Sequence, residues 1–332
     1  MKKNLLNYLC CPVCKSDLLL SAEQTHLDHI LNGEIVCRTN SAHHFRILNG
    51  VPRFAPLDQE ADKKSRTADN FGYSWNVFNT RWDNDDIAFL DFIHPVEKAA
   101  FKNKIVLDAG CGMGRFAMLA REYGAKEVLA IDLSHSVDVA FSETKEFDNI
   151  HILQGDIYNL PIKQDLIELA YSVGVLHHLP SPKHACYSIL NLLKTSGTFV
   201  MWVYGREGNE WIVRFINPIR NNITSKLPMP VLLSFSKFVG FFLWSILRLV
   251  YRPVNRCAPS ISKYLPYNHY FKFTMTETLT QNIHTVFDHL LAPIAYYLSR
   301  DEIRSWLENA NLKNIALHHL RSYSWTATGI KQ

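Results

Sequence analysis

The 332-residue chain is predicted to fold as an α/β protein around a doubly wound parallel sheet. From residue 104 onward, short apolar runs alternate with stretches of helical periodicity, beginning with KIVLDAG, RFAMLAREYG and EVLAIDL. This alternation is typical of β-α-β units, in which helices cover both faces of parallel strands. The first apolar run ends in a glycine-rich turn at 110–114, and a helical pattern follows it. Such a turn at the carboxyl end of a strand is typical of sheets that bind a nucleotide-like ligand.

The chain divides into three regions. Residues 1–56 form a small first domain that ends in NGVPRF, in which Asn-Gly predicts a tight turn. Residues 57–103 are predicted to be a linker and an N-terminal helical segment. Residues 104–332 form the main domain, with a long apolar and aromatic insertion at about 205–290 that we interpret as a helical cap.

Further elements of the main domain follow in order. A polar helix leads to the strand-like run IHILQGD, and LIELAYSVGV comes next. A helix around 184–193 and a strand at 198–204 precede the insertion. After the insertion, SRDE at 299–302 is a capping box that begins a helix, and strand-like runs follow at 313–320 and 323–329.

The overall composition argues against two classes of protein. A hydrophobic fraction of 47% allows a substantial core and excludes a disordered chain. A formal net charge of +4, from 35 Lys and Arg against 31 Asp and Glu, is too small for a dedicated nucleic-acid binder, so nucleic acid is expected to be an unlikely partner. The apolar run after Met1-Lys2-Lys3 is too short for a signal peptide, and a cytoplasmic location is expected.

Acidic residues mark the glycine-rich strand and the next two strands. Asp108 stands two residues before Gly110, Asp132 ends VLAID, and Asp156 ends IHILQGD. With the spacing GxGxG in place of GxGxxG, this set resembles the class I S-adenosylmethionine-dependent methyltransferases. The resemblance implies a Rossmann-like doubly wound sheet that an antiparallel terminal hairpin closes.

The resemblance also implies S-adenosylmethionine as the cofactor. Asp108 is expected to accept a hydrogen bond from the methionine ammonium or from an ordered water. The turn is expected to bring backbone against the ligand, because the glycines at Gly110, Gly112 and Gly114 carry no Cβ.

Two further acids are expected to hold the nucleoside. Asp132 can accept from both ribose hydroxyls, as the acid after the second strand does in nucleotide folds. Asp156 can accept from the adenine amino group, with Ile157 packed on the ring. The alternative is that Asp132 and Asp156 are ordinary caps at strand ends.

An aromatic segment, FGYSW at 71–75, resembles the segment that folds over the cofactor in related methyltransferases. Tyr73 and Trp75 are expected to attract the sulfonium through cation–π contacts. The alternative is a helix that packs in the core.

The segment SVGVLHHL at 172–179 bears on the methyl acceptor. Enzymes that methylate exocyclic base amines usually carry an (Asn/Asp)-Pro-Pro-(Tyr/Phe) turn here, and this chain lacks it. The GVLHHL form resembles methyltransferases of small molecules, lipids and glycans, and O-methylation of such an acceptor is expected. His177 or His178 is a candidate general base, with His177 slightly preferred, although the pair often has a structural role.

The acceptor is expected to dock near VFDH at 286–289, where Asp288 is a second candidate catalytic residue. The alternative for Asp288 is a helix cap in a packed loop. Five aromatic residues are further candidates on the acceptor side: Trp202, Tyr204, Trp211, Tyr296 and Tyr297.

The apolar run 231–251 is about as long as a bilayer span but contains Lys237 and Arg248. On a helix, its polar residues fall in a narrow stripe of about 80°. Two interpretations remain open. The run is either a lid helix buried against the domain, or an interfacial helix that makes peripheral membrane contact through 231–252.

The first domain contains a candidate zinc site. Cys11-Pro12-Val13-Cys14 has the spacing of a zinc knuckle, and Cys37 with His43 or His44 can complete a tetrahedral set. The segment resembles the zinc-ribbon domain fused to, or partnered with, methyltransferases, and His43 matches its His-x-Phe form. The interval from Cys37 to His43 is longer than usual. Cys10 is not expected to be a ligand.

Two other functions stay open beside small-molecule, lipid or glycan methylation. One is an RNA methyltransferase that uses the ribbon for substrate contact. The other is a non-catalytic partner protein that binds the cofactor.

Overall fold

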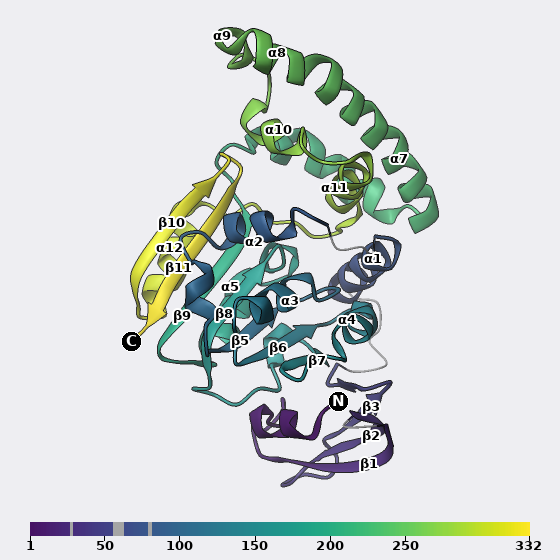
Figure 1. The fold of residues 1–332 in the computed structure, drawn as a ribbon, viewed down its shortest axis with the longest axis vertical. Coiled ribbons are helices and arrows are strands. Elements are labelled where there is room, and N and C mark those ends of the chain that lie inside the picture. Colours follow the sequence, from purple (N-terminus) through teal and green to yellow (C-terminus); the bar gives the residue numbers. More distant parts are fainter. Residues whose placement is uncertain (27–28, 56–62, 79–81) are drawn as a thin grey trace.

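A computed structural model describes residues 1–26, 29–55, 63–78 and 82–332. Its described strands form one sheet in the order β1-β2-β3-β4-β7-β6-β5-β8-β9-β11-β10 (Figure 1). The strands are β1 Leu18–His26, β2 His29–Cys37, β3 His44–Leu48, β4 Val51–Arg53, β5 Ile105–Ala109, β6 Glu127–Asp132, β7 Ile150–Gln154, β8 Ile167–Val173, β9 Leu193–Tyr204, β10 Leu312–Leu320 and β11 Ser324–Lys331.

The centre of the sheet confirms the predicted fold class. Strands β7, β6, β5, β8 and β9 are parallel, and the chain reverses its direction of travel across the sheet at β5. Strand β11 pairs antiparallel with both β9 and β10, so the last two strands form the predicted terminal hairpin. The carboxyl ends of β5 and its neighbours therefore open at the switch point where α/β sheets bind ligands.

Apolar side chains cover both faces of the central strands. Leu107 and Ile131 belong to one buried cluster, and Val106 and Ala130 belong to another. Successive residues of a strand point to opposite faces, so strands covered on both sides read as unbroken apolar runs. The helices that surround this core are α1 Lys63–Val77, α2 Asp85–Ile93, α3 Arg115–Glu122, α4 Ser136–Thr144, α5 Pro182–Leu190 and α12 Arg300–Asn309.

The first domain continues the same sheet. Strands β1 to β4 are antiparallel neighbours, and β4 reaches β7 through the pair Arg53 and Gln154. The Arg53 guanidinium also donates to the Gln154 side chain at 3.1 Å. The predicted boundary near residue 56 and most of the linker lie outside the described residues. The division into three domains therefore stays a prediction.

The insertion between β9 and α12 forms a helical cap at the end of the molecule opposite the first domain (Figure 1). Its helical segments are η5 Ile212–Ile216, α6 Asn217–Asn222, η6 Thr224–Lys226, α7 Met229–Ile246, η7 Leu247–Tyr251, α8 Arg252–Cys257, α9 Pro259–Ser262, α10 Asn268–Thr274 and α11 Leu279–Leu291. By length and composition, the helix over Met229–Cys257 is the one helix among the described residues that could cross a membrane.

The interpretation of this run as a buried lid is wrong for most of α7. Its buried residues are Leu232, Ser236 and Gly240, whereas Phe238 is 65% exposed. A Cβ at Gly240 would lie 2.8 Å from Ile283 of α11, so the side of α7 with small residues permits close approach. The bulky phenylalanines lie on other sides of the helix and remain uncovered.

Candidate functional site

A cavity of about 320 Å³ opens where β5, β6 and β7 end, between the sheet and the cap. The glycine turn, α1 and α2 supply part of its wall, and α10 and α11 supply the wall on the side of the cap. The cavity therefore joins the expected cofactor site to the region where the acceptor is expected to dock.

The turn after β5 requires glycine at two positions along the cavity. Gly110 has φ +90°, and a Cβ there would lie 2.3 Å from Val175. Gly112 has φ +52°, and a Cβ there would lie 2.8 Å from the indole nitrogen of Trp75. Gly114 precedes α3 with φ +84° and does not line the cavity. The turn exposes backbone to a ligand because no side chain covers it.

Asp132 lines the cavity and also organises the turn. Its carboxylate accepts from the Gly112 amide at 2.9 Å and from the Ser134 amide at 2.8 Å. Oδ1 also accepts from the Ser134 hydroxyl at 2.7 Å, so the remaining capacity for a ribose hydroxyl lies mainly on Oδ2. Both the predicted ligand role and the capping alternative are compatible with this position.

Asp156 and Ile157 follow β7 and line the same cavity. Asp156 accepts from the Tyr158 amide at 2.9 Å and so caps a short 3-10 turn, η3 Ile157–Asn159. The cap fixes the carboxylate at the cavity wall, which is where the adenine contact was expected.

Asp108 lies beneath the turn and does not line the cavity. It is 2% exposed, and its Oδ2 has no hydrogen-bond partner in the described part of the protein. Burial raises the pKa of this carboxyl to about 8. An unpartnered buried acceptor beside the turn fits an ammonium group or a water, as the resemblance implies.

A buried ion pair beside the turn was not foreseen from the sequence. Arg115, the first residue of α3, pairs with Asp85 at 2.9 Å. Its guanidinium lies 4.8 Å from the ring centres of both Trp75 and Trp82. Trp75 lines the cavity, but Arg115 covers one side of its ring, and the contact with the sulfonium stays a prediction. Tyr73 does not line the cavity and packs near Phe287.

The structure favours His178 over His177 at the cavity, which corrects the slight preference for His177. His177 is fully buried, does not line the cavity and lies 4.0 Å from the Tyr204 ring, centre to centre. His178 lines the cavity, and its Nδ1 is 2.7 Å from the Ile294 carbonyl. Adjacent residues of the short turn η4 Leu176–His178 point in different directions, so only one histidine reaches the cavity. Burial lowers the pKa of His178 to about 3, which keeps its ring neutral.

Asp288 lies within α11 and lines the cavity on the side of the cap. Its Oδ1 accepts from the Ser74 hydroxyl at 2.7 Å, and its Oδ2 lies 3.1 Å from His284 Nε2. Burial raises the pKa of this carboxyl to about 7, although the Ser74 hydrogen bond and the Arg115 charge oppose the shift. The cap alternative is wrong, because Thr278 caps this helix.

Sequence reasoning missed several polar residues of the cavity wall, among them Glu277, Gln281 and His284 on the side of the cap. Gln281, His284 and Asp288 follow the spacing i, i+3 and i+7, which places them on one face of α11, and Glu277 lies just before the Thr278 cap of this helix. That spacing was the signal available in the sequence. Among the predicted aromatic residues, Trp202 and Tyr204 line the cavity, whereas Trp211, Tyr296 and Tyr297 do not.

The raised pKa of Asp288 predicts a pH-dependent effect of Asp288→Asn. The wild-type fold binds a proton more tightly than the unfolded chain between about pH 4 and pH 7, so ionisation makes the wild type lose stability as pH rises through this window. Asn does not ionise, so the variant should not lose this stability. The free energy of unfolding of Asp288→Asn, relative to that of the wild type, should therefore be at least about 1 kcal/mol higher at pH 7.5 than at pH 4.5. Urea unfolding at both pH values measures the difference. The exposed Asp301→Asn control should show no such gain, and a gain of zero in Asp288→Asn would contradict the raised pKa.

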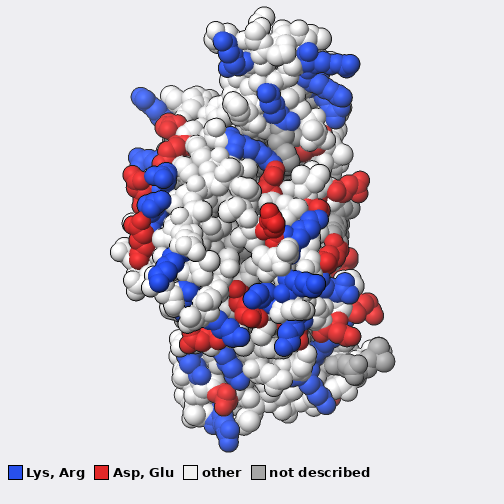
Figure 2. Space-filling view, turned by 60° about the vertical axis from the view of Figure 1, so that its left-hand side comes forward, with Lys and Arg blue, Asp and Glu red and all other residues white. Residues whose placement is uncertain are grey.

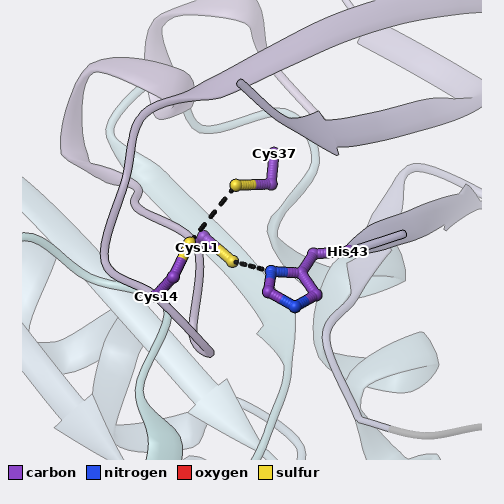
Figure 3. A group of neighbouring side chains, drawn as sticks. All are labelled: Cys11, Cys14, Cys37 and His43. Carbon is purple, nitrogen blue, oxygen red and sulfur yellow. Dashed lines mark hydrogen bonds between the residues drawn. The ribbon is translucent and has the colours of Figure 1, made fainter. Parts of the chain in front are cut away.

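The first domain brings its four predicted ligands together (Figure 3). The ligand atoms of Cys11, Cys14, Cys37 and His43 all lie within 4.8 Å of one another. Cys14 Sγ is 3.4 Å from Cys37 Sγ, and Cys11 Sγ is 3.5 Å from His43 Nδ1. Zinc–ligand bonds of about 2.0–2.3 Å in a tetrahedron give ligand separations of about 3.3–3.8 Å. The cluster could therefore bind zinc.

The long interval between Cys37 and His43 does not displace the histidine. The Cys37 amide donates to the His43 carbonyl at 2.9 Å, and the His43 amide donates to the Asn40 carbonyl at 3.0 Å. These bonds fold the extra residues into a compact loop. Hydrogen bonding with Ser16 lowers the pKa of the Cys14 thiol to about 5, which favours the thiolate form that a metal requires.

The strand order, the glycine turn and the acids at the strand ends together define a class I methyltransferase fold. Comparison with known families agrees. The family model described as "Methyltransferase domain" matches residues 107–201, and the model described as "Trm112p-like protein" matches residues 2–50. These matches support a class I S-adenosylmethionine-dependent methyltransferase domain preceded by a Trm112-like N-terminal domain. The predicted enzyme class and cofactor are thereby confirmed.

Individual relatives match only in part. A tRNA U34 carboxymethyltransferase of Cellvibrio japonicus is 29% identical over 150 residues, which are 43% of this chain and 47% of the relative. The enzyme of the same name from Pseudoalteromonas atlantica is 32% identical over 33% of this chain and 35% of the relative. A solved S-adenosylmethionine-dependent methyltransferase of Aquifex aeolicus covers 76% of this chain and 100% of its own, with 13% identity and a TM-score of 0.42. The chain thus spans less than half the length of these curated relatives.

Proposed function

We propose that the protein transfers a methyl group from S-adenosylmethionine to RNA, with tRNA as the first candidate substrate. The observation that carries the proposal is that the curated relatives are named for action on tRNA. The proposed cofactor ligands are those predicted from the sequence, with the turn and Asp132 as the main contacts. A cytoplasmic location agrees with relatives named for action on tRNA.

The predicted acceptor, a small molecule, lipid or glycan, is corrected by the relatives' names, and so is the prediction that nucleic acid is an unlikely partner. Two physical reasons explain the error. The relatives' named target is a uridine, and uracil has no exocyclic amine, so the missing Pro-Pro turn was not informative. A net charge of +4 also conceals local asymmetry, because residues 211–276 contain nine Lys and Arg and no Asp or Glu.

The cavity walls suit a nucleobase. Trp202, Tyr204, Tyr270 and Tyr323 line the cavity together with polar groups on α11. Stacking of a base on an aromatic side chain contributes about 1–3 kcal/mol. A base turned out of the RNA stack could therefore enter the cavity beside the glycine turn.

S-adenosylmethionine, when bound, supplies an activated methyl group on a sulfonium. The residues of the chain would then align the acceptor and remove its proton. Asp288 is the better candidate base, since its pKa of about 7 suits proton transfer near neutral pH, whereas the pKa of His178 is about 3. Ser74 would position the Asp288 carboxylate through its hydrogen bond to Oδ1.

Transfer of methyl, rather than of the carboxymethyl group in the relatives' name, agrees with the charges in the cavity. A carboxymethyl donor would carry an additional carboxylate, and burial of a charge requires a partner. The two arginines that line the cavity are already paired, Arg115 with Asp85 at 2.9 Å and Arg321 with Asp91. We therefore propose that the donor carries no additional anion.

Transfer of labelled methyl from S-adenosylmethionine to fractionated cell extract tests the proposed function. Label is expected in tRNA, and Asp288→Asn should lower the rate by about 100-fold or more while cofactor binding persists. Asp301→Asn is the control and should retain full activity. Label only in lipid, saccharide or protein would overturn the RNA acceptor, and cofactor binding without any transfer would overturn catalysis.

We also propose that part of the cytoplasmic protein makes peripheral contact with a membrane through residues 231–252. It is supported by the exposed apolar side chains of α7.

A further inference from the structure

We propose that the cap binds membrane surfaces that contain anionic lipids, with α7 lying in the plane of the interface. The inference rests on the proposed membrane contact and is independent of the RNA acceptor. It names the lipid class, the orientation of the helix and the residues that enter the bilayer.

Helix α7 has three distinct sides. The buried side, which carries Leu232, Ser236 and Gly240, packs against α11. The second side is an apolar stripe of exposed side chains, whose exposed fractions run from 40% at Ile246 to 65% at Phe238. The residues of the apolar stripe are Val231, Phe235, Phe238, Phe242 and Ile246. Their spacing confines them to about 80° of the helix.

The third side of α7 is polar and lies next to the apolar stripe. Lys237 is exposed on it beside Phe241, and the exposed Arg252 continues it beyond α7, whereas Arg248 is half-buried and donates to the Glu277 carbonyl at 3.5 Å. Figure 2 shows Lys and Arg, without Asp or Glu, on the visible face of the tip of the cap. The segment 211–276 contains nine basic residues and no acidic residue. An apolar stripe bordered by basic side chains is the pattern of helices that lie at anionic lipid interfaces.

The same three sides argue against other occupants of this surface. A two-fold dimer through the apolar stripe would bring its bordering cations toward their own copies, with no acidic residue between 211 and 276 to pair them. RNA is disfavoured because Val231 and Ile246, at the two ends of the apolar stripe, offer a base neither a hydrogen bond nor an aromatic face. A helix that crossed the membrane would have to leave α11 and expose Phe287 and Leu291, which are now buried.

Vesicle flotation of the full chain tests the proposal. Vesicles of phosphatidylcholine alone are compared with vesicles that also contain phosphatidylglycerol. The wild type is expected to float with the anionic vesicles. High salt should release it, because salt screens the attraction between the basic side chains and the anionic lipids. Equal recovery with both kinds of vesicle, or recovery with neither, would overturn the role of anionic lipid.

Two variants separate the apolar and charged contributions. The double variant Phe238→Asp with Phe242→Asp should lower bound protein about tenfold or more, because two large apolar side chains no longer enter the bilayer. Lys237→Glu should reduce binding only to anionic vesicles. Leu19→Asp is the matched control, since Leu19 is an exposed apolar residue of the first domain, and it should bind as the wild type does.

Cofactor binding by calorimetry, which should be unchanged in every variant, shows that the variants are folded. If the double variant floats like the wild type, the apolar stripe does not enter lipid and the proposal fails. Loss of tRNA binding without loss of flotation would assign the surface to RNA instead. If the wild type is a dimer and the double variant is a monomer, the apolar stripe instead binds a second copy of the chain.

Discussion

Asp132→Asn is expected to weaken the binding of S-adenosylmethionine by about 100-fold, because hydrogen bonds to a charged acceptor contribute about 1.5–3 kcal/mol and the ribose would lose such bonds. The asparagine side chain keeps the size of the carboxylate but replaces one acceptor with a donor. In the structure Asp132 accepts from the Gly112 and Ser134 amides, so the substitution also weakens the support of the turn. Both effects reduce affinity for the cofactor.

Isothermal titration calorimetry of the full chain measures this loss. Asp301→Asn, at a carboxylate on α12 that is 93% exposed, is the control and should bind the cofactor as the wild type does. Thermal unfolding should remain cooperative in both variants, which separates a lost ligand contact from a lost fold. An unchanged dissociation constant in Asp132→Asn would argue strongly against the proposed position of the ribose.

The central sheet and the turn were predictable because their signals are local in the sequence. The strands of the sheet are apolar runs of a few residues, and the backbone at Gly110 and Gly112 excludes a Cβ. Asp132 and Asp156 could be assigned to one site, since the carboxyl ends of parallel strands share an edge of the sheet. Cys11 and Cys14 were predictable from their short spacing, whereas Cys37 and His43 followed from the resemblance to the zinc-ribbon domain.

The contacts that escaped prediction depend on how distant elements pack. Arg115 meets Asp85 only because α2 lies against α3. Asp288 meets Ser74 across a separation of 214 residues, once α11 has packed on α1. The choice between His177 and His178 depended on the direction of each side chain in a single short turn, and the sequence pattern does not specify that direction.

The exposed side of α7 also depends on how distant elements pack, but here residues that the composition assigns to a core are exposed. The length and apolar content of 231–251 were evident in the sequence, but burial depends on which side meets α11. Gly240 and Ser236 form that side because small residues allow close approach. The phenylalanines, which composition alone assigns to a core, are therefore the residues left uncovered.

Cys14→Ser is expected to release zinc and to destabilise the first domain. A hydroxyl is a much poorer zinc ligand than a thiolate, and a domain this small obtains much of its folding free energy from the metal. A decrease of about 4 kcal/mol in the free energy of unfolding should lower the unfolding temperature by about 5 °C for a chain of this length. The effect should extend beyond the ribbon, because β4 joins β7 and Leu9 forms a bridge with Ile162.

Metal analysis of the purified full chain, together with thermal unfolding, measures both effects. Cys10→Ser is the matched control, because Cys10 is the neighbouring thiol and does not belong to the cluster of four ligands. It should retain one zinc per chain, whereas Cys14→Ser should retain much less. If Cys14→Ser kept its zinc and its unfolding temperature, apolar packing alone would stabilise the first domain. Equal loss of zinc in both variants would instead place Cys10 among the ligands, and the assignment of His43 would then have to be revised.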